Sequence, residues 1–237
     1  MKKGQKLNIS VVVVAAGKGT RMNMDINKQY IEVCEKPVLA RTLQVFEDCD
    51  HIGEIILVVN ESDIFYCKQN IIEAFSFDKV KSLVAGGAQR QNSVYNGLIE
   101  VSKDTDIVLI HDGARPFINE EIIIDCAKAA LEFGASTAAV PVKDTIKSSD
   151  KEGFVEKTLD RSTLWSIQTP QAFLYNKILG AHLKALEDGF TGTDDTVLTE
   201  RMGIRTRLVM GSYDNIKITT REDLVFAEAI INKEIKE

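Results

Sequence analysis

The chain has 237 residues, of which 44% are hydrophobic and 27% are charged, and its formal net charge is -6. This composition is that of an ordinary globular protein, and it excludes a globally disordered or fibrous chain. The acidic balance argues against a general nucleic-acid-binding surface, so no nucleic-acid partner is expected. The longest apolar run, Ile9–Ala16, falls far short of the ~20 residues of a membrane-spanning helix, so no membrane partner is expected either.

The compartment can be inferred from the start of the chain and from its cysteines. The basic residues 1–6 lead into an apolar stretch with no small-residue cleavage site, which predicts that no signal peptide is present and that the protein is cytoplasmic. The cysteines form no CxxC pair and have no histidine at metal-ligand spacing; they are Cys34, Cys49, Cys67 and Cys126. We therefore expect reduced, packed thiols instead of disulfides or a zinc site.

Short β-branched runs alternate with segments of helical periodicity along the first two thirds of the chain. The predicted strands are Ile9–Ala16, Glu54–Asn60, Lys79–Ala85, Asp106–His111 and Ser136–Val142. The predicted helices are Leu39–Glu47, Ser62–Phe75, Gln91–Val101 and Glu120–Phe133, the last with Asn119 as its N-cap and Gly134 at its end. This alternation predicts a single α/β domain, residues 1–237, with a mostly parallel, twisted sheet and helices on both faces.

One polar stretch interrupts that alternation. Between Asp144 and Leu159, two short alternating runs flank a segment with Gly153, which predicts a β-hairpin. Its composition suits a contact between subunits better than a core, so we predict a projecting arm at about residues 141–164 and a homodimer formed through it. The chain then ends in an alternating segment, Asn215–Thr219, and a helix whose capping box is Thr219 and Glu222.

A glycine-rich turn follows the first predicted strand, at the edge where open α/β sheets bind ligands. It reads Ala-Ala-Gly-Lys-Gly-Thr-Arg-Met over residues 15–22 and matches neither a dinucleotide fingerprint nor a Walker loop. Its backbone N–H groups can point at phosphate oxygens, and Arg21 and Lys28 can neutralise a polyphosphate. The alternative is an ordinary strand-to-loop turn.

Polar residues also follow later strands. Asp112, at the end of a buried run, is placed to hold Mg²⁺ on phosphates, or it only opens a turn before Pro116. Gly86 and Gly87 allow a flat ligand to approach closely, or they only make a tight loop in which Ser93 caps the next helix.

The sequence gives weaker evidence of function for the isolated cations and the histidines. Lys217 is expected on a late strand, and Arg161 follows the hairpin. Each side chain either faces the site or is solvated. His111, Arg115 and Pro116 are expected to shape the loop after the strand that ends near His111. His51 and His182 are expected at the surface or in packing, because the sequence offers them no partner.

Eight segments together resemble one family in order and spacing. They are residues 15–22, 28–30 (Lys-Gln-Tyr), 86–93 (Gly-Gly-Ala-Gln-Arg-Gln-Asn-Ser), 111–117 (His-Asp-Gly-Ala-Arg-Pro-Phe), 141–145, 160–165, 168–171 (Gln-Thr-Pro-Gln) and 215–219 (Asn-Ile-Lys-Ile-Thr). The family is 2-C-methyl-D-erythritol 4-phosphate cytidylyltransferase, and the resemblance runs from about residue 9 to residue 232. It implies a Rossmann-like nucleotidyltransferase that joins CTP to methylerythritol phosphate and releases pyrophosphate, in the non-mevalonate route to isoprenoids.

The resemblance also implies roles for single residues. Arg21 and Lys28 occupy the positions of the family's transition-state stabilisers, and Asp112 occupies the position of its Mg²⁺ ligand. The nucleotide-binding positions are Ala15, Ala16, Gly17, Lys18 and Gly19 for the triphosphate and base, and Gly87, Ala88 and Ser93 for cytosine and ribose. The positions that hold the sugar phosphate are Thr145, Arg161 and Lys217, of which the first two reach the partner subunit's substrate from the arm. Ala88 stands where some relatives have an acidic residue, so a backbone contact to cytosine has to serve there.

Two alternatives remain at this point. Ribitol 5-phosphate cytidylyltransferase shares the Gly-Thr-Arg-Met loop and the Gln-Thr-Pro-Gln segment, although Ala15-Ala16-Gly17 and the segment from Asp160 to Trp165 look like the erythritol enzyme. The chain could also be a non-catalytic nucleotide-binding regulator, because a fold alone does not determine function.

Overall fold

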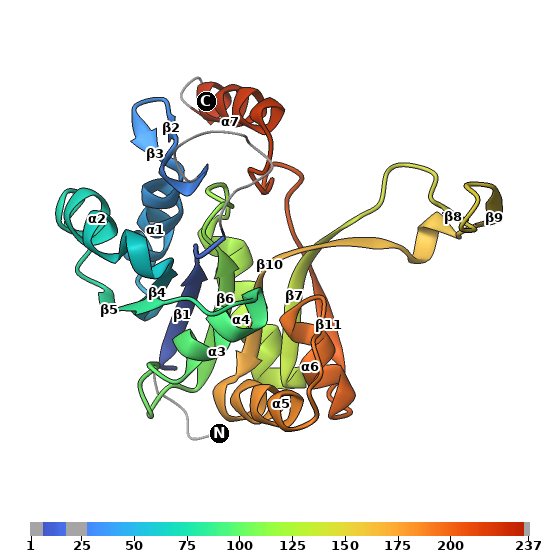
Figure 1. Ribbon diagram of the computed structural model, residues 1–237, viewed down its shortest axis with the longest axis horizontal. Coiled ribbons are helices and arrows are strands. Elements are labelled where there is room, and N and C mark those ends of the chain that lie inside the picture. Colours follow the sequence, from blue (N-terminus) through green and yellow to red (C-terminus); the bar gives the residue numbers. More distant parts are fainter. Residues whose placement is uncertain (1–6, 18–27, 235–237) are drawn as a thin grey trace.

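A twisted, mostly parallel sheet forms the centre of the protein. The computed structural model describes residues 7–17 and 28–234, and within them seven strands pair in the order β11-β7-β10-β6-β1-β4-β5 (Figure 1). These strands are β1 (Ile9–Val14), β4 (Ile52–Val59), β5 (Val80–Ala85), β6 (Ile107–Asp112), β7 (Ala135–Pro141), β10 (Trp165–Leu174) and β11 (Thr206–Met210). Neighbouring strands are parallel except where β10 pairs with β6 and β7. The predicted α/β fold with a mostly parallel sheet is confirmed.

Helices cover both faces of this sheet, as predicted. On one face lie α1 (Val38–Asp48), α2 (Ile64–Cys67) with η4 (Lys68–Glu73), and α4 (Glu120–Phe133); on the other lie α3 (Arg90–Leu98) and α5 (Tyr175–Glu187). Successive side chains of β1 lie on opposite faces of the sheet, which explains the two layers. Val11 and Val13 pack into the first core and Val12 packs into the second, all without exposed surface. Burying such a side chain stabilises the fold by about 1.5–3 kcal/mol, so both cores hold the strand ends, and the loops that follow them, in place.

The remaining elements lie around these layers. The α6 helix (Asp195–Arg201) packs Leu198 against α5, and α7 (Arg221–Glu234) packs Ala227 and Ile231 against a small apolar cluster beside α1. The short elements are η2 (Lys28–Tyr30), the ribbon of β2 (Glu32–Val33) and β3 (Lys36–Pro37), and η3 (Glu61–Asp63). None of the helices in the described ranges is both long and apolar enough to cross a membrane.

Two predicted helix ends can be compared with the structure. Asn119 Oδ1 accepts a hydrogen bond from Ile122 N at 2.9 Å, and Gly134 ends α4 at a φ of 94°, so both predicted caps are confirmed. The capping box of α7 is wrong by one residue, because the carboxylate that accepts from the N–H groups of Thr219 and Thr220 belongs to Asp223, not Glu222.

Several segments differ from the sequence prediction. The predicted helix 62–75 is divided into η3, α2 and the π-helical η4, and residues 215–219 form no strand. Sequence reasoning did not find β10, α5, α6 or β11. The β10 strand was hidden because it contains Pro170 and buried glutamines. Its pairing with β7 shifts register between Ile167 and Gln171, which is where a sheet tolerates proline.

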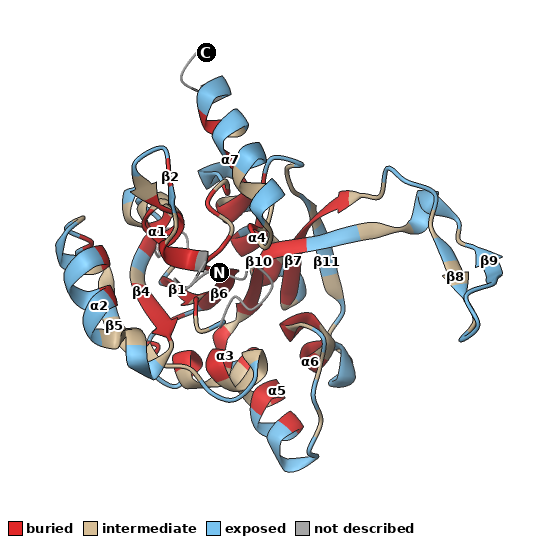
Figure 2. Ribbon diagram, turned by 45° about the horizontal axis from the view of Figure 1, so that its top comes forward, coloured by how far each residue is buried: buried red, intermediate tan, exposed pale blue. Residues whose placement is uncertain are grey.

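The predicted hairpin is confirmed as a ribbon outside the central sheet. Its strands β8 (Lys147–Ser149) and β9 (Val155–Thr158) are antiparallel, and η5 (Arg161–Thr163) leads back to β10. The ribbon extends well away from the body, and Figure 2 shows that most of it is exposed. Phe154 and Val155 at its turn are 70% and 60% exposed, which leaves apolar surface uncovered on an element with little core of its own.

The cysteines have free thiols. Cys49, Cys67 and Cys126 are buried, and burial raises the pKa of each thiol, so these three are packed as predicted. Cys34 is exposed in the turn between β2 and β3, so the prediction of a packed thiol is wrong there.

Candidate active site

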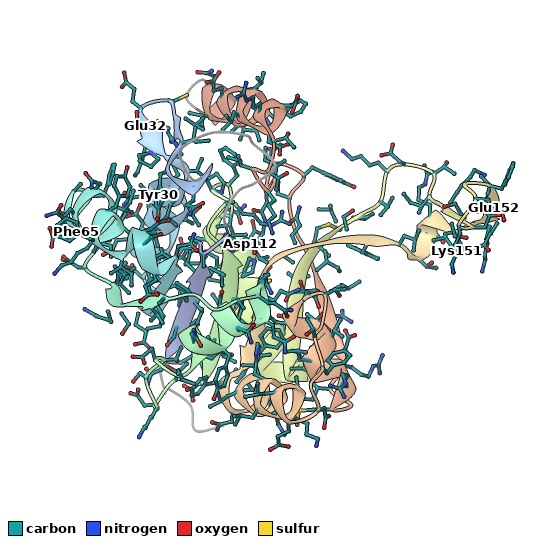
Figure 3. All side chains as sticks on the ribbon, viewed as in Figure 1. Tyr30, Glu32, Phe65, Asp112, Lys151 and Glu152 are labelled. Carbon is teal, nitrogen blue, oxygen red and sulfur yellow. The ribbon has the colours of Figure 1, made fainter. Side chains whose placement is uncertain are left out.

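The predicted nucleotide-binding segments meet at the carboxyl edge of the sheet. Val14, which ends β1, pairs with Asp112, which ends β6, and Val59 of β4 pairs with Ala85 of β5. The turn at Ala15–Gly17, the loop 86–89 and Asp112 therefore lie together, because they follow neighbouring parallel strands. Figure 3 shows Asp112 near the middle of the body, far from Lys151 and Glu152 at the tip of the arm.

Part of the predicted site lies outside the described residues. These positions are Lys18, Gly19 and Arg21. Lys28 begins η2, and its side chain is also outside what the structure describes. The next residue, Gln29, is buried and donates from Nε2 to the Ala15 carbonyl oxygen at 2.9 Å, which holds η2 against the glycine-rich turn.

The turn after β1 and the loop after β5 pack directly on each other at Gly86. A Cβ at this position would lie 2.3 Å from Cβ of Ala16, so only glycine allows the two loops to approach this closely. Beside it, Gly87 and Ala88 are exposed at the edge. The resemblance assigns this stretch to cytosine, and its exposure suits that assignment.

Ser93 holds this loop and does not cap the helix. Its Oγ accepts from Gly87 N at 3.0 Å and donates to the Gln89 carbonyl oxygen at 3.1 Å, while Asn92 Oδ1 accepts from Gln89 N at the start of α3. Ser93 is 2% exposed. The alternative in which Ser93 caps α3 is therefore wrong, because Gln89 is the N-cap, and the hydroxyl of Ser93 supports the backbone of Gly87.

Asp112 is a buried carboxylate among three cations. Lys217 Nζ lies 2.7 Å from Oδ2, Arg115 Nε lies 3.6 Å from Oδ2, and Arg90 Nε lies 3.5 Å from Oδ1. Burial by itself would raise the pKa of Asp112, but Lys217 and Arg90 outweigh it and hold that pKa well below its usual range. Asp112 is therefore ionised at neutral pH.

The segment that carries Lys217 is fixed by a buried asparagine. Asn215 has no exposed surface, and its Nδ2 donates to Gln168 Oε1 at 3.2 Å and to the Thr169 carbonyl oxygen at 3.0 Å. Its own carbonyl oxygen accepts from Arg115 Nη1 at 2.7 Å. Lys217 therefore lies beside Asp112, on a docked loop and not on the predicted strand.

The backbone of Asp112 is held by a buried chain of hydrogen bonds. Asp112 N donates to the Thr169 hydroxyl at 3.1 Å, and that hydroxyl lies 3.1 Å from His111 Nδ1. On the other side of the ring, His111 Nε2 lies 3.0 Å from the Arg115 carbonyl oxygen, so the proton of the neutral ring is on Nε2. His111 has a structural role here, as predicted.

This role makes stability depend on pH. Burial lowers the pKa of His111 to about 4, below the value of 6.5 expected in the unfolded chain. The folded state then binds fewer protons, so the stability from the neutral ring is complete above pH 6.5 and is lost as pH falls toward 4. The free energy of unfolding should decrease by about 2 kcal/mol between pH 7 and pH 5, measured by urea titration.

An exposed histidine supplies the matched control. His111→Gln should remove most of this pH dependence, whereas His51→Gln, at an exposed position, should leave it in place. An equal pH dependence in His111→Gln and the wild type would contradict the assignment.

The arm residues are not joined to this cluster within the described part of the chain. Arg161 is exposed, and its Nη1 donates to the Lys143 carbonyl oxygen at 2.7 Å. Thr145 is exposed as well, on the segment that leads into β8. Neither residue has a hydrogen bond or ion pair with Asp112 among the described residues, and the arm points away from the body (Figure 1).

Sequence reasoning missed the contacts of five residues in or beside the site. Arg115 was assigned only to loop shape, although its position three residues after Asp112 was a usable signal for an ion pair. Arg90, Thr169 and Asp195 lie far from Asp112 in the chain, and no local pattern connects them. His182 was expected to have no partner, but it is buried with Nε2 3.2 Å from Asp195 Oδ1.

The chain is similar to one group of known proteins over nearly its whole length. The sequence profile described as 2-C-methyl-D-erythritol 4-phosphate cytidylyltransferase matches residues 9–233. The protein of that name from Caldanaerobacter subterraneus subsp. tengcongensis is 51% identical over 227 residues, 96% of this chain and 100% of the relative. That from Clostridium novyi is 52% identical over 220 residues, 93% of this chain and 95% of the relative.

Solved structures agree with these matches. The 4-diphosphocytidyl-2C-methyl-D-erythritol synthase from Anaerococcus prevotii has a TM-score of 0.85 at 36% identity and covers 96% of this chain and 97% of its own. The 2-C-methyl-D-erythritol 4-phosphate cytidylyltransferase from Thermus thermophilus has a TM-score of 0.76 at 29% identity, with 94% and 98% covered. The predicted Rossmann-like nucleotidyltransferase fold is confirmed, and the chain belongs to the 2-C-methyl-D-erythritol 4-phosphate cytidylyltransferase family.

Proposed function

We propose that this enzyme transfers the cytidylyl group of CTP to 2-C-methyl-D-erythritol 4-phosphate at the carboxyl edge of the sheet, releasing pyrophosphate. The observation that supports this site best is the ionised Asp112 among Lys217, Arg115 and Arg90, beside the nucleotide loops at residues 15–17 and 86–89. Membership of the family favours methylerythritol phosphate over ribitol 5-phosphate. It also favours an enzyme over a non-catalytic regulator.

The reaction needs charge and position more than proton transfer. A phosphate oxygen of the polyol phosphate is already ionised at neutral pH, attacks the α-phosphorus of CTP and forms the new P–O bond as the bond to pyrophosphate breaks. No general base is required, which agrees with the described residues of the site, among which no nucleophile is paired to a base. Positioning and charge neutralisation then supply the catalysis.

The proposed roles follow the chemistry of the side chains. Arg21 and Lys28 stabilise the charge that grows on the α-phosphate and on the departing pyrophosphate. Residues 15–19 bind the triphosphate through backbone N–H groups in this proposal, and Gly87 and Ala88 contact the base. Lys217 lies at the edge beside Asp112 and holds the phosphate of the second substrate.

The residues present fit a magnesium ion that is shared with the substrate. Among the described residues, no three His, Cys, Asp or Glu side chains gather into a metal site. Mg²⁺ is usually bound by one or two carboxylates together with substrate phosphates, and the ionised Asp112 can supply one such ligand. Bound there, the ion would neutralise phosphate charge.

Asp112→Asn tests this assignment, because it keeps the size of the side chain and removes its charge. We expect the half-saturating Mg²⁺ concentration to rise by more than about tenfold in an assay of pyrophosphate release. Asp125→Asn, at a half-exposed carboxylate of α4, is the matched control and should leave the titration unchanged. A wild-type titration curve for Asp112→Asn would exclude Asp112 as the metal ligand.

The remaining expectations concern the whole protein. We propose that the chain works as one nucleotidyltransferase domain, residues 1–237, and forms a homodimer through the arm at about residues 141–164. The exposed Phe154 and Val155 support this dimer, because a partner subunit would cover them. We place the enzyme in the cytoplasm, which the free thiols of its cysteines support.

A turnover assay tests the proposed reaction directly. The enzyme is supplied with CTP, Mg²⁺ and either methylerythritol phosphate or ribitol 5-phosphate, and pyrophosphate is measured. A higher kcat/KM with methylerythritol phosphate is expected. Faster use of ribitol 5-phosphate would indicate the other cytidylyltransferase, and no pyrophosphate with either polyol phosphate would indicate a regulator.

A further inference from the structure

Arg90 lies between two buried carboxylates and binds them unequally. Its Nη1 is 2.6 Å from Asp195 Oδ2, whereas its Nε is 3.5 Å from Asp112 Oδ1. Asp195 is 1% exposed and Asp112 is 7% exposed. The firm partner of Arg90 is therefore Asp195, and Asp112 is the weak one.

Asp195 is anchored on the side away from Arg90. Its backbone N–H donates to Gln171 Oε1 of β10 at 3.1 Å, and its Oδ1 lies 3.2 Å from the buried His182 Nε2. Burial would raise the pKa of Asp195, but Arg90 outweighs it and the pKa is lowered, so Asp195 is ionised. A fixed and charged Asp195 holds Arg90 in place.

The two oxygens of Asp112 consequently differ. Oδ2 faces both Lys217, at 2.7 Å, and Arg115, at 3.6 Å. Within the described ranges, Oδ1 has one cationic partner, Arg90, at a distance that makes only a weak contact. Within the described residues, Oδ1 is therefore the less neutralised of the two oxygens.

We propose that Asp195 is a positioning residue that holds Arg90 back from Asp112 and so keeps Oδ1 of Asp112 available to a divalent cation. This inference rests on the proposed role of Asp112 as a metal ligand. Without the charge of Asp195, Arg90 closes on Asp112 and neutralises Oδ1. A divalent cation must then displace a guanidinium, and its affinity falls.

If Arg90 competes with the cation for Asp112, double variants should behave differently than they would if Asp195 had a purely structural role. If Asp195 acts by restraining Arg90, removing Arg90 as well should relieve the effect of losing Asp195. If Asp195 only stabilises the fold, the double variant should be worse than either single variant.

The readout is the binding of CTP without turnover. The dissociation constant of CTP is measured by calorimetry in EDTA and in Mg²⁺, with no polyol phosphate present, and the ratio gives the gain in affinity from the metal. Asp195→Asn should reduce this ratio about tenfold. Asp195→Asn combined with Arg90→Gln should restore it, and Arg90→Gln alone should enlarge it.

Controls separate this inference from the proposed metal site. Asp112→Asn should abolish the gain in CTP affinity that Mg²⁺ gives. If it does not, Asp112 is not the metal ligand, and both the proposed metal site and the role of Asp195 are wrong. If Asp112→Asn abolishes the gain and Asp195→Asn keeps the wild-type ratio, only the role of Asp195 is overturned. Asp188→Asn, which breaks a surface pair with Arg201 at 3.1 Å, is the matched control and should change nothing.

Folding is checked by thermal unfolding of each variant. If Asp195→Asn does not fold, Arg90→Gln alone still decides the question, because it leaves Asp195 in place. A smaller ratio in Arg90→Gln than in the wild type would overturn the inference.

Discussion

Replacing Arg21 or Lys28 by alanine should lower kcat about 10²–10³-fold while CTP affinity changes little. Both cations follow the glycine-rich segment in the sequence, and in the role proposed for them their charge matters most when the α-phosphate and the departing pyrophosphate become more negative. An interaction that strengthens in the transition state lowers kcat when it is lost. Steady-state kinetics in both substrates, with calorimetric CTP binding, measures the two effects separately.

Lys128→Ala supplies the matched control. Lys128 is an exposed cation of α4 that pairs with Asp125 at 3.6 Å, so its removal changes the net charge by the same amount without touching the edge of the sheet. It should leave kcat unchanged. If the loss in Arg21→Ala or Lys28→Ala were confined to KM, these residues would bind the ground state and would not stabilise the transition state.

The sequence predicted the edge of the sheet well because parallel strands impose it. A buried β-branched run followed by a polar loop ends at the same edge as every other such run, so Asp112, Gly86 and the glycine-rich turn could be grouped before any contact was known. For Lys217, the sequence left open whether the side chain faces the site, and it placed the residue on a strand. That placement was wrong because the segment is held by Asn215, whose buried hydrogen bonds leave no periodic pattern.

The sequence could not predict the ion pairs that cross the fold. Arg90 and Asp195 are 105 positions apart, and their contact depends on α6, which has no strong periodic signal in its seven residues. The strand β10, which supplies Thr169 beneath Asp112, was hidden by its proline and its buried glutamines. Polar residues in a core look like loop residues until their partners are known.

Two inactive variants, one of them in the arm, should regain activity when their subunits are mixed. Arg21→Ala and Arg161→Ala should each be nearly inactive alone. Arg161 lies on the projecting arm, without a contact to Asp112 in the described part of its own chain, so we expect it to serve the partner subunit. There its guanidinium can hold the substrate phosphate with two hydrogen bonds, which lysine cannot reproduce.

Mixing the two inactive variants should therefore restore activity. In a mixed dimer, one site combines an intact Arg21 with an intact Arg161 from the other subunit's arm, and the second site lacks both. Random pairing makes about half of the dimers mixed, so about a quarter of the wild-type activity should return. If each subunit supplied its own Arg161, both sites of the mixed dimer would lack one residue and no activity would return.

The measurement must first establish that subunits exchange. Differently tagged variants are mixed, incubated and purified through both tags, and the doubly tagged dimers are assayed for pyrophosphate release. Each purified mixed dimer has one intact site of two, so its activity should be about half that of the wild type, whereas the unpurified mixture should show about a quarter. Arg161→Lys in place of Arg161→Ala, used alone, should remain strongly impaired, because it keeps the charge and loses the paired hydrogen bonds. Verified mixed dimers without activity would show that Arg161 acts within its own subunit or has no part in the reaction, and the shared site would be wrong.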